Sequence, residues 1–171
     1  TRNSVKVFKE CLKYGTTSFE VKSGYGLNVD DEVKMLIAAT NAAKECGVTI
    51  SRTLLAAHAV PPEYKDRKNE YIDLINNSIT PEIAKRKIAE NVDVFCEDGV
   101  FSVDESRSIL KTGMKFGLKP RLHVDEFKAI GGLSLAAELK ATSADHLMVS
   151  DKKEFEAFKE AGSIGVVLPG T

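Results

Sequence analysis

Hydrophobic residues along the chain follow two alternating patterns, one typical of strands and one typical of helices. Short runs of β-branched and aromatic residues, each closed by a turn or by polar residues, predict buried strands. They occur six times, at residues 16–21, 48–59, 92–96, 118–124, 144–149 and 164–168. Helically spaced apolar residues fill the intervals and predict helices at residues 28–47, 64–75, 81–90, 102–117, 131–139 and 151–161.

Residues with capping preferences mark several of the expected helix ends. Asn28 or Asp30 is expected to cap the first helix, and Gly47 to end it. The Thr80-Pro81 pair predicts an N-cap followed by the first helical residue of 81–90. Residues 102–105 (Ser-Val-Asp-Glu) have the spacing of a capping box.

Strands that alternate with helices predict a parallel sheet joined by helical crossovers. Two α/β architectures fit this alternation: an open doubly wound sheet, or part of a (β/α)8 TIM barrel. No GxGxxG or P-loop sequence follows the first strand, which removes the usual nucleotide-binding forms of the open sheet. No linker or low-complexity segment interrupts the pattern, so residues 1–171 are expected to form one domain or part of one.

The composition narrows the classes of function. Lys plus Arg total 24 and Asp plus Glu total 25, so the chain lacks the basic footprint of a nucleic-acid-binding protein. No apolar run approaches the ~20 residues needed to cross a bilayer. Cys11, Cys46 and Cys96 form no CxxC pair, which predicts reduced thiols in a cytoplasmic protein. We therefore expect a small-molecule substrate, and neither nucleic acid nor a membrane as partner.

Polar side chains gather at or near the ends of the predicted strands, with Asp145 and His146 early in the fifth. These residues are Lys22, Tyr25, His58, Glu97, Asp98, His123, Asp125, Glu126, Asp145 and His146. The carboxyl ends of the strands of a parallel barrel share one face, which is where barrel enzymes build their active sites. This convergence favours the barrel, against the alternative that polar residues simply gather in loops.

The segment His123-Val124-Asp125-Glu126 is the clearest local signal. In a strand, His123 and Asp125 would point to the same side, and Glu126 would lean over the barrel mouth from the loop. A neutral imidazole suits Zn or Fe, and a nearby carboxylate suits proton transfer to a metal-activated water. The alternative is a surface histidine beside two solvated acids, which its place in the fourth of six units argues against.

Other polar residues leave two interpretations open. His146 is either a core histidine hydrogen-bonded to Asp145 or an acid–base group facing the barrel. His58 follows an apolar run, where a polar group needs a buried partner or a ligand. Tyr25 lies between two glycines and is either an ordinary surface residue or a substrate contact. Lys22 is expected to form an ion pair or to anchor a loop.

Six segments resemble, in order, the strand ends of the imidazolonepropionase family of the amidohydrolase superfamily. They are residues 20–27 (EVKSGYGL), 57–64 (AHAVPPEY), 96–102 (CEDGVFS), 123–126 (HVDE), 143–147 (SADHL) and 168–170 (LPG). KSGYG and AHAVPPEY are fairly specific to that family, whereas HxDE and ADHL also occur in cytosine and guanine deaminases. The resemblance implies an incomplete TIM barrel of about six βα units that correspond to strands 2–7.

The resemblance also implies an activity and the residues that carry it. The family opens the cyclic amide of 4-imidazolone-5-propanoate to N-formimidoyl-L-glutamate in histidine degradation, with one Zn or Fe ion. By position, His123 is the implied metal ligand. Glu126 is implied to contact the substrate and move protons, and His146 to orient or deprotonate the attacking water. Tyr25 and His58 are implied to bind the substrate.

The sequence departs from the family pattern at both ends. It contains no HxH metal pair of the first barrel strand, and nothing follows Thr171 to supply the Asp ligand of the eighth. One histidine cannot hold a catalytic zinc, which takes three protein ligands. The start at Thr1 without Met also suggests a fragment. We expect this chain alone to be inactive, and its edge strands 16–21 and 164–168 to favour self-association or a homo-oligomer.

Two other functions stay open on sequence grounds. The chain could belong to another amidohydrolase, such as a nucleobase deaminase, which would release ammonia. It could also be a non-catalytic α/β module that binds no metal and hydrolyses nothing.

Overall fold

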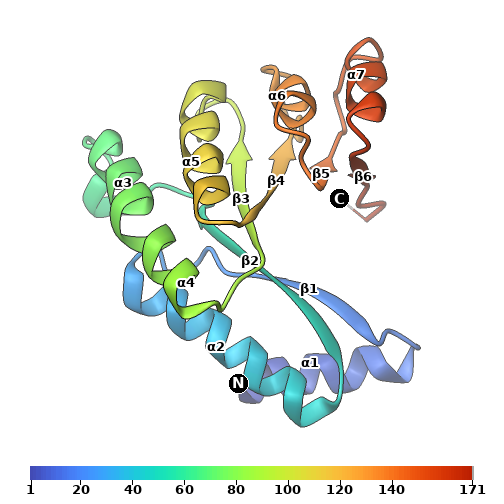
Figure 1. The fold of residues 1–171 in the computed structure, drawn as a ribbon. Helices are drawn as coiled ribbons and strands as arrows, with labels where there is room; N and C mark the ends of the chain where they lie inside the picture. Colours follow the sequence, from blue (N-terminus) through green and yellow to red (C-terminus); the bar gives the residue numbers. More distant parts are fainter. Residues whose placement is uncertain (171) are drawn as a thin grey trace.

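The computed structural model describes residues 1–170 and contains one sheet of six strands (Figure 1). The strands are β1 (Ser18–Lys22), β2 (Thr49–Ala57), β3 (Asn91–Cys96), β4 (Lys119–Val124), β5 (Ser143–His146) and β6 (Ile164–Val166). They lie in the order β1-β2-β3-β4-β5-β6, and every neighbouring pair is parallel. The six predicted strands are therefore confirmed, with small shifts at their ends.

Helices connect the strands and line the outer side of the curved sheet (Figure 1). They are α1 (Arg2–Lys13), α2 (Val29–Cys46), α3 (Lys68–Leu74), α4 (Thr80–Arg86), α5 (Val103–Lys115), α6 (Gly132–Glu138) and α7 (Glu154–Glu160). A short 3-10 helix, Pro62–Tyr64, precedes α3, and a π turn, Ile75–Ile79, joins α3 to α4. Among residues 1–170, no helix combines the length and apolar character needed to cross a membrane.

The strand order decides between the two architectures that the sequence allows. A doubly wound sheet reverses direction at a switch point, so consecutive strands are not all neighbours there. Here the spatial order equals the chain order throughout, as in a (β/α)8 barrel. Within the described residues, β1 and β6 each pair with a single neighbour, so the fold is an incomplete α/β barrel with two free edges.

Helix α1 is a feature that the sequence patterns did not predict. Its apolar side chains Val5 and Phe8 are buried against Ala42 and Ala43 of α2, and the ring centroid of Phe8 lies 4.8 Å from that of Phe19 on β1. This small apolar cluster is separate from the main core. α1 precedes the first strand, so the alternation of strands and helices gave no reason to expect it.

Capping at α2 and α5 agrees with the predicted signals. The side chain of Asn28 accepts a hydrogen bond from the backbone N–H of Asp31 at 2.9 Å, whereas Asp30 lies inside α2. Gly47 ends α2 in the left-handed conformation, at φ 69°. Both hydrogen bonds of the capping box at residues 102–105 are present.

The predicted N-cap at Thr80 is wrong. Thr80 is fully buried and has helical dihedral angles (φ −59°, ψ −47°), so residues 68–86 form one continuous helical run. Pro81 lacks the N–H that an α-helix needs at an internal position, and the π turn of Ile75–Ile79 directly precedes it. Because of this irregular turn, the helix continues through Pro81 and does not end there.

Candidate active site

The two faces of the sheet differ in chemistry because alternate strand residues point in opposite directions. On β3, Val92 and Val94 are fully buried in the apolar core under the helices. Asn91, Asp93 and Phe95 alternate with them and lie on the opposite, concave face. The polar concave residues of the neighbouring strands, all joined by hydrogen bonds or ion pairs, are Glu20, Lys22, Thr53, Arg121, His123, Ser143 and Asp145.

Lys22 links three strands at the centre of this face. Its Nζ lies 2.6 Å from Oδ2 of Asp93 on β3 and 3.0 Å from Oδ2 of Asp145 on β5. A third carboxylate, that of Glu20, lies 3.2 Å away. The ion pair expected for Lys22 is thus confirmed, and its partners come from strands far apart in the chain.

The charges of this cluster stabilise one another against burial. Burial alone would lower the pKa of Lys22, but the carboxylates of Asp93 and Asp145 outweigh it and raise the pKa above its ordinary value. Burial alone would raise the pKa of Asp93, but the positive charges of His123 and Lys22 outweigh it and lower the pKa. Both groups therefore stay charged near neutral pH.

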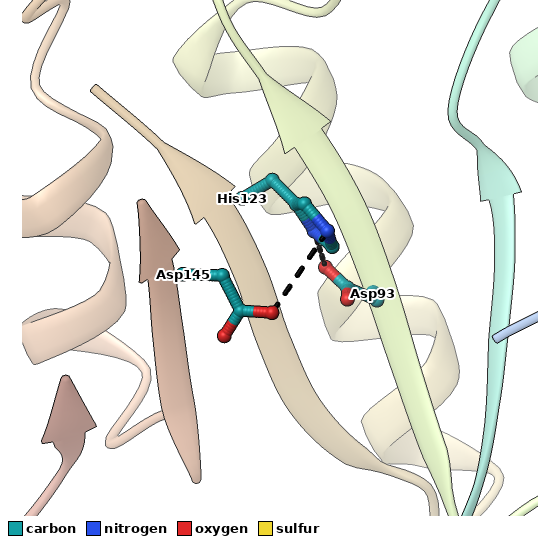
Figure 2. A group of neighbouring side chains, drawn as sticks. All are labelled: Asp93, His123 and Asp145. Carbon is teal, nitrogen blue, oxygen red and sulfur yellow. Dashed lines mark hydrogen bonds and ion pairs between the residues drawn. The ribbon is translucent and has the colours of Figure 1, made fainter. Parts of the chain in front are cut away.

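His123 lies between two carboxylates, as Figure 2 shows. Its Nδ1 is 3.0 Å from Oδ1 of Asp93, and its Nε2 is 3.8 Å from Oδ2 of Asp145. Burial alone would lower the pKa of His123, but the charge and hydrogen bond of Asp93 outweigh it and raise the pKa. Asp93 thereby fixes the orientation of the ring and leaves Nε2 facing the concave side.

His146 and Glu126 meet beside His123. Nε2 of His146 lies 3.4 Å from Oε2 of Glu126, and the His146 ring centroid lies 5.4 Å from that of His123. In an extended strand His146 would face away from the side that Asp145 occupies. A left-handed backbone at His146 (φ 79°) and Leu147 (φ 59°) ends β5 at this point. In the described residues the ring pairs with Glu126 and not with Asp145, which favours the barrel-facing interpretation of His146.

Five rings form an arc along the carboxyl ends of the strands. Neighbouring ring centroids are 5.0 Å apart for Tyr25 and His58, 6.3 Å for His58 and Phe95, and 6.3 Å for Phe95 and His123. His146 completes the arc beyond His123. The Tyr25 end is 79% exposed, whereas the His146 end is buried, so the arc leads from solvent into the site.

The turn that carries Tyr25 is fixed by a buried acid. The carboxylate of Glu32, at the start of α2, is fully buried and accepts hydrogen bonds from the backbone N–H groups of Gly24, Gly26 and Leu27 at 2.8 to 3.2 Å. Gly24 has φ 112°, and a Cβ there would lie 2.7 Å from a backbone oxygen, so only glycine fits. The backbone around the exposed Tyr25 side chain is therefore held in place.

Asp125 does not lie where the strand pattern predicts. β4 ends at Val124, and Asp125 is left-handed (φ 54°), so its side chain does not join His123 on the concave face. It is fully buried, and its Oδ2 accepts a hydrogen bond from Oγ of Ser150 at 2.6 Å. Burial raises the pKa of Asp125. The expected shared side with His123 is wrong because the left-handed backbone at Asp125 ends the strand alternation at Val124.

The structure brings together the five residues to which the family resemblance assigns a role, and adds two. Tyr25, His58, His123, Glu126 and His146 all lie along the arc or beside it. Sequence reasoning missed two residues of β3, Asp93 and Phe95. A charged residue between Val92 and Val94 in a buried strand was the available signal for Asp93, because a buried charge requires a partner. Phe95 gave no signal, since an aromatic residue is ordinary in a strand.

The donors on the concave face fit part of a metal site. Asp93, His123 and Asp145 offer ligand atoms that all lie within 4.8 Å of one another. A carboxylate on one ring nitrogen is the usual arrangement around a metal-binding histidine, and Asp93 holds His123 in this way. Lys22 already neutralises Asp93 and Asp145, however. Nε2 of His123 is the donor best placed for a metal ion, and a catalytic zinc needs further ligands beyond it.

Comparison with known proteins gives close relatives in sequence. No protein-family model matches the chain. The imidazolonepropionase of Geobacillus thermodenitrificans is 48% identical over 160 residues, which are 94% of this chain and 38% of that protein. The imidazolonepropionase of Flavobacterium johnsoniae is 44% identical over 161 residues, 94% of this chain and 39% of that protein. The chain thus spans somewhat over a third of the length of the curated relatives that it matches.

Solved structures with the same fold are more distant in sequence. The guanine deaminase of C. acetobutylicum superposes with a TM-score of 0.66 at 15% identity, over 96% of this chain and 42% of that chain. The ochratoxinase of A. niger superposes with a TM-score of 0.63 at 15% identity, over 95% of this chain and 43% of that chain. At such identities the likeness shows the barrel fold alone. At 42 to 48% identity over 94 to 98% of its length, the chain is a sequence relative of part of the imidazolonepropionases.

Proposed function

We propose that this chain forms the central part of a metal-dependent hydrolase that opens the cyclic amide of 4-imidazolone-5-propanoate to N-formimidoyl-L-glutamate, a step of histidine degradation. The observation that carries the proposal is the pairing of His146 with Glu126 at 3.4 Å, directly beside the His123 ring. Amide hydrolysis needs a proton acceptor and a proton donor near one reacting carbon, and this pair supplies both.

In this proposal His123 holds the metal ion through Nε2, and Asp93 is its orienting partner. The 3.0 Å hydrogen bond between Asp93 and Nδ1 supports this division, since Nε2 makes no hydrogen bond within the described residues and has the Asp145 carboxylate 3.8 Å away. A bound Zn or Fe ion would act as a Lewis acid that polarises the amide carbonyl and lowers the pKa of the attacking water. The choice between Zn and Fe rests on the family resemblance and not on these donors.

His146 and Glu126 act as the proton-transfer pair. His146 accepts the proton of the attacking water, and Glu126 delivers a proton to the departing ring nitrogen. Their contact supports this exchange, because the 3.4 Å between Nε2 of His146 and Oε2 of Glu126 needs to close only slightly to reach the distance of a proton-transfer hydrogen bond. Both side chains are largely buried, which keeps bulk water away from the transferred proton.

The exposed part of the aromatic arc binds the substrate. Tyr25 and His58 form its outer end, and Phe95 lies between His58 and His123. A planar five-membered ring fits among these side chains by stacking or edge contacts. The substrate is thus a small heterocyclic molecule, in line with the absence of a basic or acidic excess in the chain.

The proposal extends to where and how the chain works. Catalysis requires metal ligands in addition to His123, so we expect the 171-residue chain by itself to be inactive. Its three thiols are free, which supports a reducing compartment such as the cytoplasm. The free edges of β1 and β6 support association with a further strand, either from the rest of the barrel or from a second copy.

The test is an assay of the complete gene product that contains this chain, loaded with Zn or Fe. We expect loss of 4-imidazolone-5-propanoate, followed by its ultraviolet absorbance, with a fall of at least about a hundredfold in kcat for Glu126→Gln and for His146→Asn. Lys34→Met, an exposed change on α2, is the matched control and keeps full activity. Ammonia release from a nucleobase, with the imidazolone untouched, would replace this proposal with a deaminase.

A further inference from the structure

The loop that carries Glu126 is held by a buried acid of the neighbouring strand end. Glu97 follows β3 and is only 2% exposed. Its Oε2 accepts a hydrogen bond from the backbone N–H of Phe127 at 3.0 Å, and its Oε1 accepts one from the backbone N–H of Lys128 at 3.1 Å. These are the two amides that directly follow Glu126 in the chain.

No cation takes up the charge of Glu97 among the ion pairs of the described residues. The nearby ammonium of Lys128 pairs with Asp98 instead, at 2.9 Å. The third hydrogen bond to the Glu97 carboxylate comes from the backbone N–H of Asp98, at 2.9 Å. The buried charge is therefore satisfied by backbone amides, and hydrogen bonds to a charged acceptor are stronger than those between neutral groups.

The residue before Glu126 is anchored from the opposite side. The carbonyl of Asp125 accepts a hydrogen bond from the backbone N–H of Val149 at 3.1 Å, and its carboxylate accepts one from Ser150 at 2.6 Å. Both partners lie in the segment that follows His146. The loop is thus held on both sides of Glu126. Asp125 is hydrogen-bonded to the segment after β5, and Phe127 and Lys128 are hydrogen-bonded to Glu97 at the end of β3.

We infer that Glu97 is a positioning residue that places the Glu126 carboxylate against His146. Among the described residues it makes no hydrogen bond or ion pair with His123, Glu126 or His146 themselves, and it acts through the backbone of the loop. The inference deepens the proposed function and rests on it for the role of the pair, whereas the coupling of Glu97 to the pair can be measured without catalysis.

The test is a double-mutant cycle read by NMR at one fixed pH. The chain has three histidines, so the ring signals of His146 can be assigned by substitution. Glu126→Gln removes the neighbouring carboxylate and is expected to shift these signals. If Glu97 positions Glu126, Glu97→Gln shifts them in the same direction, and the double variant shifts them no further than Glu126→Gln alone. Asp98→Asn, an exposed change beside Glu97, leaves them in place.

Hydrogen exchange of the wild-type chain keeps the inference testable if Glu97→Gln fails to fold. The amides of Phe127 and Lys128 are expected to exchange at least about tenfold more slowly than an unprotected loop amide, because a charged acceptor holds both. Unprotected amides would overturn the inference. So would additive shifts in the double-mutant cycle, which would make Glu97 a purely structural residue.

Kinetic assays of the complete, metal-loaded gene product distinguish a failure of this inference from a failure of the proposed function. There Glu97→Gln is expected to lower kcat at least about tenfold with little change in KM, and Glu97→Asp to recover part of the loss. If the wild-type protein does not hydrolyse the imidazolone but the NMR coupling is present, the positioning role stands and the proposed reaction falls.

Discussion

Nζ of Lys22 lies 2.6 Å from Oδ2 of Asp93, although 71 residues separate them in the chain. The pair joins β1 to β3 across the intervening β2, and Asp93 has no exposed side-chain surface. This ion pair therefore stabilises the concave face, and its loss leaves the buried Asp93 carboxylate with one positive partner fewer, His123 remaining.

Lys22→Met is expected to lower the free energy of unfolding by about 3 kcal/mol, because the buried carboxylate of Asp93 then loses a positively charged partner. Urea unfolding measures the change. Lys34→Met is the matched control, because the ion pair of Lys34 with Asp31 is exposed and its loss is therefore expected to leave stability nearly unchanged. Equal stability of the two variants would contradict the bracing role.

The acid sensitivity of the fold is expected to depend on Glu105. Burial alone would raise the pKa of Glu105, but hydrogen bonds from Lys68 and from the backbone of Ser102 outweigh it and lower the pKa. A carboxyl with a lowered pKa in the folded state adds stability above its ordinary pKa of 4.5, and this stability is lost as the pH falls through the folded value.

Wild-type stability should therefore fall more steeply below pH 4.5 than the stability of Glu105→Gln. Urea unfolding across the acid range gives both curves. In the Lys68→Met background the difference between Glu and Gln at position 105 should shrink. Parallel curves for all four proteins would show that the ion pair contributes nothing to folding.

Phe95→Ala is expected to weaken binding of a planar imidazole ligand two- to tenfold, or about 0.5 to 1.5 kcal/mol, the usual contribution of an aromatic contact. Imidazole-4-propanoate, titrated while the ring signals of His58 and His123 are followed by NMR, is a suitable probe. Phe116→Ala, on the far end of α5, serves as the control. Unchanged affinity for Phe95→Ala would remove Phe95 from the binding site.

The three cysteines should differ in reactivity. Cys96 is fully buried, and burial raises the pKa of its thiol, with the charges of Asp125 and Glu97 adding to the effect. Cys11 and Cys46 are only partly buried. A thiol reagent should modify these two in the native chain and Cys96 only when urea unfolds it. Rapid labelling of Cys96 in the native state would show that the core around β3 opens readily.

Self-association at the sheet edge is expected to depend on β6. Its residues are exposed, and Val166 is 37% exposed. A charge on an edge strand opposes pairing with another chain, so Val166→Lys should shift the sedimentation profile toward the monomer. A wild-type chain that stays monomeric at every concentration would argue against association through this edge.

Periodicity along the chain was sufficient to predict the six strands and most of the helices, because both are local properties. Periodicity did not predict that the helix continues through Pro81, since the π turn that accommodates the proline depends on packing. Periodicity also did not predict the side-chain contacts between strands across the sheet. The sequence identified His123 as important but gave no reason to join it to Asp93, which lies 30 residues earlier.

Within the site, periodicity alone also does not predict the direction in which the His146 side chain points. The sequence placed His146 early in the fifth predicted strand, where strand alternation alone would turn its ring away from the side of Asp145. The left-handed backbone at His146 decides the matter, and no residue pattern specifies it. Asp125 is the converse case, since the strand pattern placed it beside His123 and the positive φ removes it.

The left-handed residues at the ends of β4 and β5 have an energetic meaning. Asp125, His146 and Leu147 occupy a conformation that costs an ordinary residue about 1 to 2 kcal/mol, and none of them is glycine. A sequence optimised for folding alone would relax these positions, starting with Leu147→Gly. The chain instead tolerates strain at the two strand ends that position Glu126 and His146, so a search for more stable variants would be drawn to His146 and to the neighbours of the proposed proton-transfer pair.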